Sequence, residues 1–394
     1  MNLLEQQLHY PLGDTLPALG ETLAVAPGVR WIRMALPFAL NHINLWLLED
    51  EIDGQRGWSV VDCCISADAS RAQWEAIFAT QLGGLPILRV IVTHMHPDHI
   101  GLASWLCARW NAPLWISATD YFVAEHNIAH SSGNGGPGAA EFFQKHGLID
   151  PEAVEKIRAR TGYFSAMVPA LPPSFVRMQD GQTLRIGGRS WHCISGYGHA
   201  PEHIALYCAD TQAALTEASS PSQRDGLEAQ RPSFPVLIGG DMMLPRISTN
   251  VSVFDVEPES NPLQQFLDSI DKFAPLAADT LTLPAHGKPF QGLHTRIQQL
   301  HDHHRDHLAR VMAFARLQPC SAADILPVLF TRVLDLHQTT FAMGEAVAHL
   351  HKLWVDGYLQ RTRGTDGVYR FSPTALAYPE SAALEPSEAV PISA

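Results

Sequence analysis

The feature that most constrains the fold is a cluster of histidines and one aspartate that follows an apolar, β-rich run. The run covers residues 88–92, and residues 93–99 continue it as THMHPDH. Side chains at offsets of 0, 2, 4 and 5 cannot all share one face of a helix, so we expect a turn at a strand end that directs them two ways. Such a turn predicts two adjacent metal sites. The four candidate ligands are His94, His96, Asp98 and His99.

The donor types narrow the choice of metal. Imidazole and carboxylate together suit zinc, with iron and manganese as alternatives. No cysteine stands in residues 93–99, which argues against a structural, cysteine-rich site. The competing interpretation is a polar turn without a metal, because the chain contains 20 histidines.

Three further candidate ligands stand at the ends of predicted strands. His199 follows the run 191–194, Asp241 ends the run VLIGGD, and His286 follows LTLP. Each has glycine or proline close by in the sequence. Any one of them alone is typical of an ordinary polar loop residue, but as an ordered set they are much more specific.

In this order the residues resemble the motifs of the metallo-β-lactamase superfamily, over roughly residues 23–300. The resemblance implies a four-layer αβ/βα sandwich with one zinc on His94, His96 and His199. It implies a second zinc on Asp98, His99 and His286, with Asp241 bridging the two. Asp62 matches the position that orients a ligating histidine by bonding to the ring nitrogen that does not bind metal. The alternative for Asp62 is an aspartate that caps a helix or a turn.

A pair of zinc ions per chain predicts hydrolysis. We expect a hydroxide held between the metals to attack a small ester, thioester or lactone, with Asp98 as a catalytic residue that fixes the attack direction. His203 is the second catalytic candidate. It is either a buried strand histidine or a site residue that hydrogen-bonds substrate or shuttles a proton.

Two other functions stay open. After Gln318 two helical patterns, near 321–336 and 341–356, precede a β-rich end, which predicts a winged-helix-like domain and allows a metal-dependent endoribonuclease that uses it as an RNA platform. A mononuclear iron persulfide dioxygenase uses a subset of the same ligands. His96 stands where flavo-diiron relatives usually carry a carboxylate, which disfavours oxygen reduction.

Charge favours a small-molecule substrate over RNA. The chain has 27 Lys and Arg against 40 Asp and Glu, a formal net charge of −13, which argues against attraction to nucleic acid or anionic membranes. The larger nucleases of the superfamily insert a whole domain between the positions that Asp241 and His286 match. Here these residues are only 45 positions apart, which leaves no room for such a domain.

The remaining expectations concern organisation. We expect a catalytic domain over 1–317, the winged-helix-like domain over 318–375 and a flexible tail over 376–394. The C-terminal helices should pack on the catalytic domain or on a second subunit. The six cysteines are expected to be reduced core thiols, and neither a signal peptide nor a membrane span is recognisable, so we expect a cytoplasmic protein.

Three sequence stretches suggest other features. The run 133–138 matches G-x-G-x-x-G but follows a helical pattern, and Pro137 interrupts the stretch that should open a helix, so a flexible loop or a lid is expected instead of a dinucleotide site. Residues 216–235 are expected to form a mobile loop. The run HDHHRDH, residues 301–307, is expected to be a solvated helix face, with a second metal site as the alternative.

Overall fold

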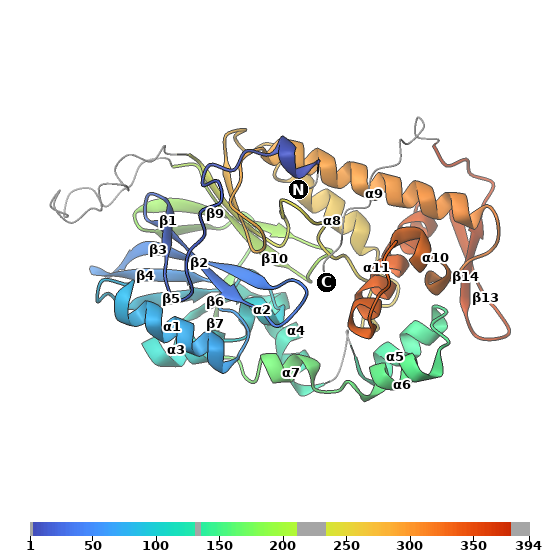
Figure 1. Ribbon diagram of the computed structural model, residues 1–394, viewed down its shortest axis with the longest axis horizontal. Helices are drawn as coiled ribbons and strands as arrows, with labels where there is room; N and C mark the ends of the chain where they lie inside the picture. Colours follow the sequence, from blue (N-terminus) through green and yellow to red (C-terminus); the bar gives the residue numbers. More distant parts are fainter. Residues whose placement is uncertain (1–2, 131–134, 211–233, 380–394) are drawn as a thin grey trace.

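The computed structural model describes residues 3–130, 135–210 and 234–379, and within them two β-sheets form the part of the chain that precedes the C-terminal segment (Figure 1). The first sheet has the strand order β1-β2-β3-β4-β5-β6-β7 and the second β12-β11-β10-β9-β8. The first sheet consists of β1 (Leu23–Ala26), β2 (Val29–Ala35), β3 (His42–Ile52), β4 (Gln55–Val61), β5 (Ile87–Ile91), β6 (Leu114–Ser117) and β7 (Phe175–Met178). The second consists of β8 (Thr183–Ile186), β9 (Arg189–Gly196), β10 (His203–Cys208), β11 (Val236–Gly240) and β12 (Leu281–Pro284).

Apolar residues on both faces of the first sheet explain the layering. Successive side chains of a strand point to opposite faces, and in β2 Trp31 packs in the core between the two sheets while Ile32 packs in a core on the other face. That second core is closed by α1 (Asp68–Thr80), α3 (Ala103–Trp110) and α4 (Ala118–Ala129). Helices α8 (Pro262–Asp271) and α9 (Leu293–Ala315) cover the second sheet (Figure 1). The predicted four-layer αβ/βα sandwich is confirmed.

Parallel pairing brings the expected site positions to one edge of each sheet. Strands β4 and β5 are parallel neighbours, and so are β11 and β12. The carboxyl ends of parallel neighbours lie at the same edge of a sheet. The segments that carry Asp62, residues 93–99, Asp241 and His286 all leave their strands at such ends.

The C-terminal segment contains α10 (Ala322–Leu329), α11 (Leu336–Val355), β13 (Leu359–Arg363) and β14 (Tyr369–Pro373). The expected helix over 321–336 therefore ends earlier and the next one begins earlier, because Asp335 starts α11 with a capping box formed with Gln338. The segment packs on the preceding part of the same chain, since Leu329 and Leu350 share a core with Met312 of α9. The winged-helix assignment and the domain limits stay predictions.

The remaining helices correct two expectations. These helices are α2 (Pro97–Ile100), α5 (Gly136–Lys145), α6 (Pro151–Ala159), α7 (Tyr163–Met167) and a 3-10 turn at Glu5–Gln7. Pro137 does not prevent a helix: α5 begins at Gly136, and proline is tolerated in a first turn because its missing N–H has no partner there. The run 301–307 is not a solvated face, because His304 and His307 are buried where α9 meets α11.

Several expectations on loops lie outside the described residues. Residues 131–134, nearly all of the expected loop 216–235, and residues 380–394 of the expected tail belong to this group. Within the described part of the chain, all six cysteines are buried and free. A search of the same residues finds no helix with the length and apolar character that a membrane crossing requires.

Candidate metal centre

Every expected ligand lies at the edge where the two sheets meet, because each stands just past a strand end. Asp62 follows β4 directly with a left-handed backbone angle, φ +64°. Residues 93–99 follow β5 and enter the short helix α2, which contains Asp98 and His99. The rings of His94 and His99 lie side by side, with their centres 3.9 Å apart. His199 lies in the turn between β9 and β10.

Three histidine rings converge on one point. Nε2 of His94 lies 2.9 Å from Nδ1 of His96, which lies 3.1 Å from Nε2 of His199. Nε2 of His199 is in turn 3.2 Å from Nε2 of His94. Ring nitrogens bound to one tetrahedral zinc lie roughly 3.3 Å apart, which follows from zinc–nitrogen bonds of about 2.0–2.1 Å. The three nitrogens therefore have the spacing of ligands on a common ion.

Asp98, His99 and His286 form a second group beside the first. Oδ2 of Asp98 lies 3.4 Å from Nε2 of His286 and 3.8 Å from Nε2 of His99. One ligand atom from each of these three residues lies within 4.8 Å of the others. The same holds for the first group together with Asp241.

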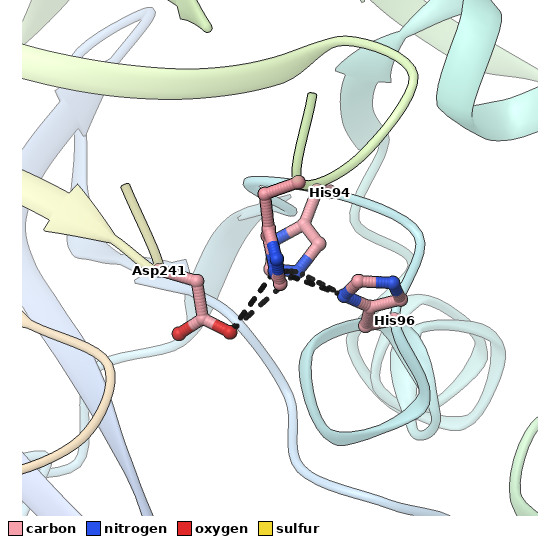
Figure 2. Close-up of side chains that lie close together, drawn as sticks. His94, His96 and Asp241 are labelled. Carbon is pink, nitrogen blue, oxygen red and sulfur yellow. Dashed lines mark hydrogen bonds and ion pairs between the residues drawn. The ribbon is translucent and has the colours of Figure 1, made fainter. Parts of the chain in front are cut away.

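Asp241 stands between the two groups. Its Oδ2 lies 3.2 Å from Nε2 of His199, while its Oδ1 lies 3.4 Å from Nε2 of His286. Figure 2 shows the side chains of Asp241, His94 and His96 directed toward one another, with Asp241 coming from the end of β11. Oδ2 also lies 3.6 Å from Nε2 of His99, so the carboxylate contacts both groups.

The outer ring nitrogens are held by hydrogen bonds that fix the direction of each ring. His199 Nδ1 donates to the carbonyl oxygen of Asn250 at 2.8 Å, and His286 Nδ1 donates to that of His42 at 2.6 Å. His99 Nδ1 lies 2.8 Å from Oδ2 of Asp62. Such contacts leave Nε2 as the nitrogen available to a metal. Asp62, which was expected to orient a ligand in this way, is therefore in contact with His99 of the second group.

The electrostatics at His96 and Asp241 also fit a cation. Burial lowers the pKa of His96 to about 3, so the ring is neutral near pH 7, the form that binds metal. Burial alone would raise the pKa of Asp241, but His286 and His99 hold it well below its usual value. His99 Nε2 and Asp241 Oδ1 are buried without a hydrogen-bond partner. A divalent ion would satisfy both atoms.

His203 lies behind this centre. Its side chain is fully buried, its ring centre is 5.0 Å from that of His94, and it lines neither of the two cavities described below. Gly240 makes room for it: a Cβ there would lie 2.2 Å from Nε2 of His203. This position suits support of the His94 ring, and the catalytic role of His203 stays a prediction.

Asp120 was not found by sequence reasoning. Its carboxylate is fully buried and accepts hydrogen bonds from the backbone N–H of Met95 at 2.7 Å and of Glu202 at 2.6 Å. It therefore ties the loop of His94 and His96 to the loop of His199. Its only sequence signal is a Ser-x-x-Asp spacing at the start of α4, where Ser117 caps the helix.

Two adjoining cavities open onto the centre. The larger, about 380 Å³, is lined mainly by apolar side chains, together with His96, His199 and polar residues such as Arg160 and Glu257. The smaller, about 140 Å³, also contacts Asp98, Asp241 and His286. Apolar residues of the larger cavity include Met95, Val123, Phe164, Phe254 and Val256. The centre is thus reached from a mainly apolar chamber large enough for a small organic molecule.

Comparisons with known proteins agree with this architecture. Residues 40–216 match the family described as the metallo-beta-lactamase superfamily, and residues 308–374 match the metallo-beta-lactamase-like C-terminal domain. The chain belongs to the metallo-beta-lactamase superfamily. The predicted family is confirmed, and with it the expected class of enzyme, a hydrolase of this fold.

Particular relatives are similar over most of the chain. A beta-lactamase domain protein from Burkholderia ambifaria is 51% identical in a crystal structure with a TM-score of 0.84, over 95% of this chain and 100% of that one. A metallo-beta-lactamase family protein from Thermus thermophilus is 26% identical, with a TM-score of 0.67 over 89% and 100% of the two chains. A protein of Bacillus subtilis (strain 168) named probable metallo-hydrolase is 24% identical over 82% of this chain and 91% of its own.

Proposed function

We propose that this protein is a dinuclear zinc hydrolase of small carboxylic esters, thioesters or lactones. The observation that carries the proposal is Asp241, whose two oxygens face His199 and His286 in separate ligand groups. In this assignment one ion is held by His94, His96 and His199, and the other by Asp98, His99 and His286. Nitrogen and carboxylate donors suit zinc, and iron or manganese would be accepted by the same set.

The chain's own residues would position substrate and water. Two ions at such a centre supply a hydroxide near neutral pH and polarise a carbonyl oxygen. Oδ2 of Asp98 makes the contacts to His99 and His286, so we assign its Oδ1 to accept a hydrogen bond from the attacking water. The neutral ring of His96, at the edge of both cavities, bounds the space in which the carbonyl would lie.

The apolar chamber supports a small acyl substrate. Its volume of about 380 Å³ lies within the range of small-molecule sites, and Phe164 and Phe254 present aromatic surface to it. Burial of an acyl or leaving group there would contribute roughly 25 cal/mol for each Å² of apolar surface removed from water. Removal of water around the carbonyl would strengthen the polar contacts that Asp98 makes.

The basic residues of the C-terminal hairpin are engaged within the chain, which weighs against RNA. Arg361 donates to both carboxylate oxygens of Glu259 at 2.7 and 3.0 Å, and its guanidinium lies 4.0 Å from the ring centre of Trp354. Arg370 donates to both oxygens of Asp366. The side chain of Arg361 is only 14% exposed, so this arginine offers little to a phosphate backbone, while the Arg370 pair lies at the surface.

A paired assay tests the proposal. Protein stripped of metal and reloaded with zinc, iron or manganese is given a panel of thioesters, esters and lactones, single-stranded RNA, and a glutathione persulfide with oxygen consumption recorded. We expect zinc-dependent turnover of at least one acyl substrate. Cleavage of RNA alone, or oxygen consumption with the iron form alone, would overturn it in favour of an endoribonuclease or a persulfide dioxygenase.

A further inference from the structure

A second group of histidines lies away from the metal centre, where α9 packs against α11. Helix α9 contributes His303, His304 and His307, and α11 contributes Glu345 and His349. Glu345 is 1% exposed, and the ring centres of His303 and His307 are 4.0 Å apart. Figure 1 shows α11 beside the C-terminal half of α9. The two helices thus enclose polar groups in a place where apolar side chains usually pack.

Three of these residues are arranged as ligands. One ligand atom each from His303, His307 and Glu345 lies within 4.8 Å of the others. Histidines at positions i and i+4 of a helix share one face, a spacing found in helical zinc sites. Glu345 approaches that face from the neighbouring helix, as a third ligand must.

Each of the three residues also has a buried atom without a hydrogen-bond partner. These atoms are Nε2 of His303, Nδ1 of His307 and Oε1 of Glu345. A buried polar atom without a partner is destabilising, and three of them in one cluster need a common explanation. Burial lowers the pKa of His303 to about 3, which leaves its ring in the neutral form that binds cations.

We propose that His303, His307 and Glu345 form a separate binding site for one divalent transition-metal cation, of which zinc is the best match to two imidazoles and a carboxylate. The cation joins α9 to α11 and thereby fixes the C-terminal segment on the catalytic part of the chain. It is structural, because Glu345 is buried and neither cavity of the metal centre contains any of the three residues.

The site also has a short connection to the first centre. Oε2 of Glu345 accepts a hydrogen bond from Nδ2 of Asn250 at 3.2 Å, and the carbonyl oxygen of Asn250 accepts from His199 at 2.8 Å. A cation on Oε1 of Glu345 leaves Oε2 free to keep this contact. The carboxylate therefore serves both its proposed ion and the residue that orients His199.

Zinc content tests the proposal. Wild type, His303→Ala, His307→Ala and the control His301→Ala are stripped with a chelator, dialysed against a small excess of zinc and analysed for zinc per chain. His301 is on the same helix but pairs with Asp271 at the surface. We expect both site variants to hold one zinc fewer than wild type and His301→Ala to match wild type. Equal zinc in all four proteins would overturn the site and leave a metal-free polar cluster.

Zinc content and melting temperature of a more conservative variant keep the proposal testable if His303→Ala or His307→Ala does not fold. Burial raises the pKa of Glu345 to about 8, so the carboxyl would lose its proton when it binds the cation. Glu345→Gln keeps the size of the side chain but cannot ionise, and we expect it to lose the same single zinc. The zinc-dependent rise in melting temperature should also be smaller in this variant than in wild type, since a ligand stabilises only the state that binds it. An equal rise with equal zinc content would refute the site.

Failure here can be told apart from failure of the proposed function. The readout is the difference caused by substitutions on α9 and α11, whatever number of ions the first centre holds. Asp241→Ala should lose zinc from the first centre and keep the zinc that His303→Ala removes. If Asp241→Ala and His303→Ala lose the same ion, as the double variant would reveal, the site on α9 and α11 is not separate.

Discussion

The carbonyl oxygen of Asn250 accepts a hydrogen bond from Nδ1 of His199 across 2.8 Å. Because that proton occupies Nδ1, the other ring nitrogen, Nε2, is the one that meets His94 and His96. Asn250 itself is anchored through its side chain to Glu345 and Ser252. The orientation of one ring at the centre thus depends on a residue that sequence reasoning did not single out.

Asn250→Ala should weaken zinc binding while leaving the fold intact. The carbonyl oxygen remains, but the side-chain hydrogen bonds that hold Asn250 in place are lost. We expect the zinc affinity of the first centre to fall by up to about tenfold, the lower end of the range for residues that orient a metal ligand. Competition with a chromophoric chelator measures this. An unchanged affinity would show that the backbone alone holds Asn250 in place.

Asp98→Asn should reduce turnover more than metal binding. The amide oxygen can still contact a metal, but it lacks the charge with which the carboxylate would hold the attacking water. We expect kcat on the best acyl substrate to fall by roughly 100-fold at confirmed metal occupancy. A fully loaded variant with unchanged kcat would remove Asp98 from the mechanism.

Gly240→Ala should disrupt the support behind His94. The backbone there has φ +51°, and the added Cβ would meet Nε2 of His203 at 2.2 Å. Gly181→Ala is the matched control, because its φ is +73° and no atom lies within 4 Å of a new Cβ. We expect about 1 kcal/mol of lost stability in the control and at least 2 kcal/mol in Gly240→Ala, by chemical denaturation. Equal losses would mean that the His203 ring moves freely.

The buried carboxyl of Asp120 should make the free energy of unfolding depend on pH. Burial raises its pKa from 3.8 to about 6, although the N–H groups of Met95 and Glu202 lower it in part. The protonated form is thus favoured in the folded state, so its contribution is complete below pH 3.8 and is lost as pH rises through about 6. The loss is at most about 3 kcal/mol.

The Asp120→Asn side chain cannot titrate, so comparing this variant with wild type shows the pH dependence that Asp120 causes. Between pH 4 and pH 6 the free energy of unfolding of wild type should fall relative to the variant, measured by chemical denaturation of metal-free protein. A constant difference across this range would contradict the raised pKa. The variant should also lose hydrolytic activity, because its NH₂ group cannot replace both acceptor oxygens for Met95 and Glu202.

The candidate ligands could be proposed from the sequence because each follows an apolar run, while their division between two metals was implied by the resemblance to the superfamily. The motif at 93–99 and the strand-end positions of Asp241 and His286 follow from apolar runs that stop at polar residues. Contacts such as Asp120 with Met95 depend on loops that only tertiary packing brings together. The run 301–307 was misassigned for the same reason, since its burial depends on α11, which begins about thirty residues later.

The most direct test of the dinuclear assignment is zinc content and thioester hydrolysis of Asp241→Ala in a His303→Ala background, which removes the ion proposed between α9 and α11. With Asp241 present, this background should hold two zinc ions per chain and retain activity. With Asp241→Ala it should hold one or none and lose activity, because the carboxylate that faces both groups is gone. Two retained zinc ions with full activity in Asp241→Ala would contradict the account.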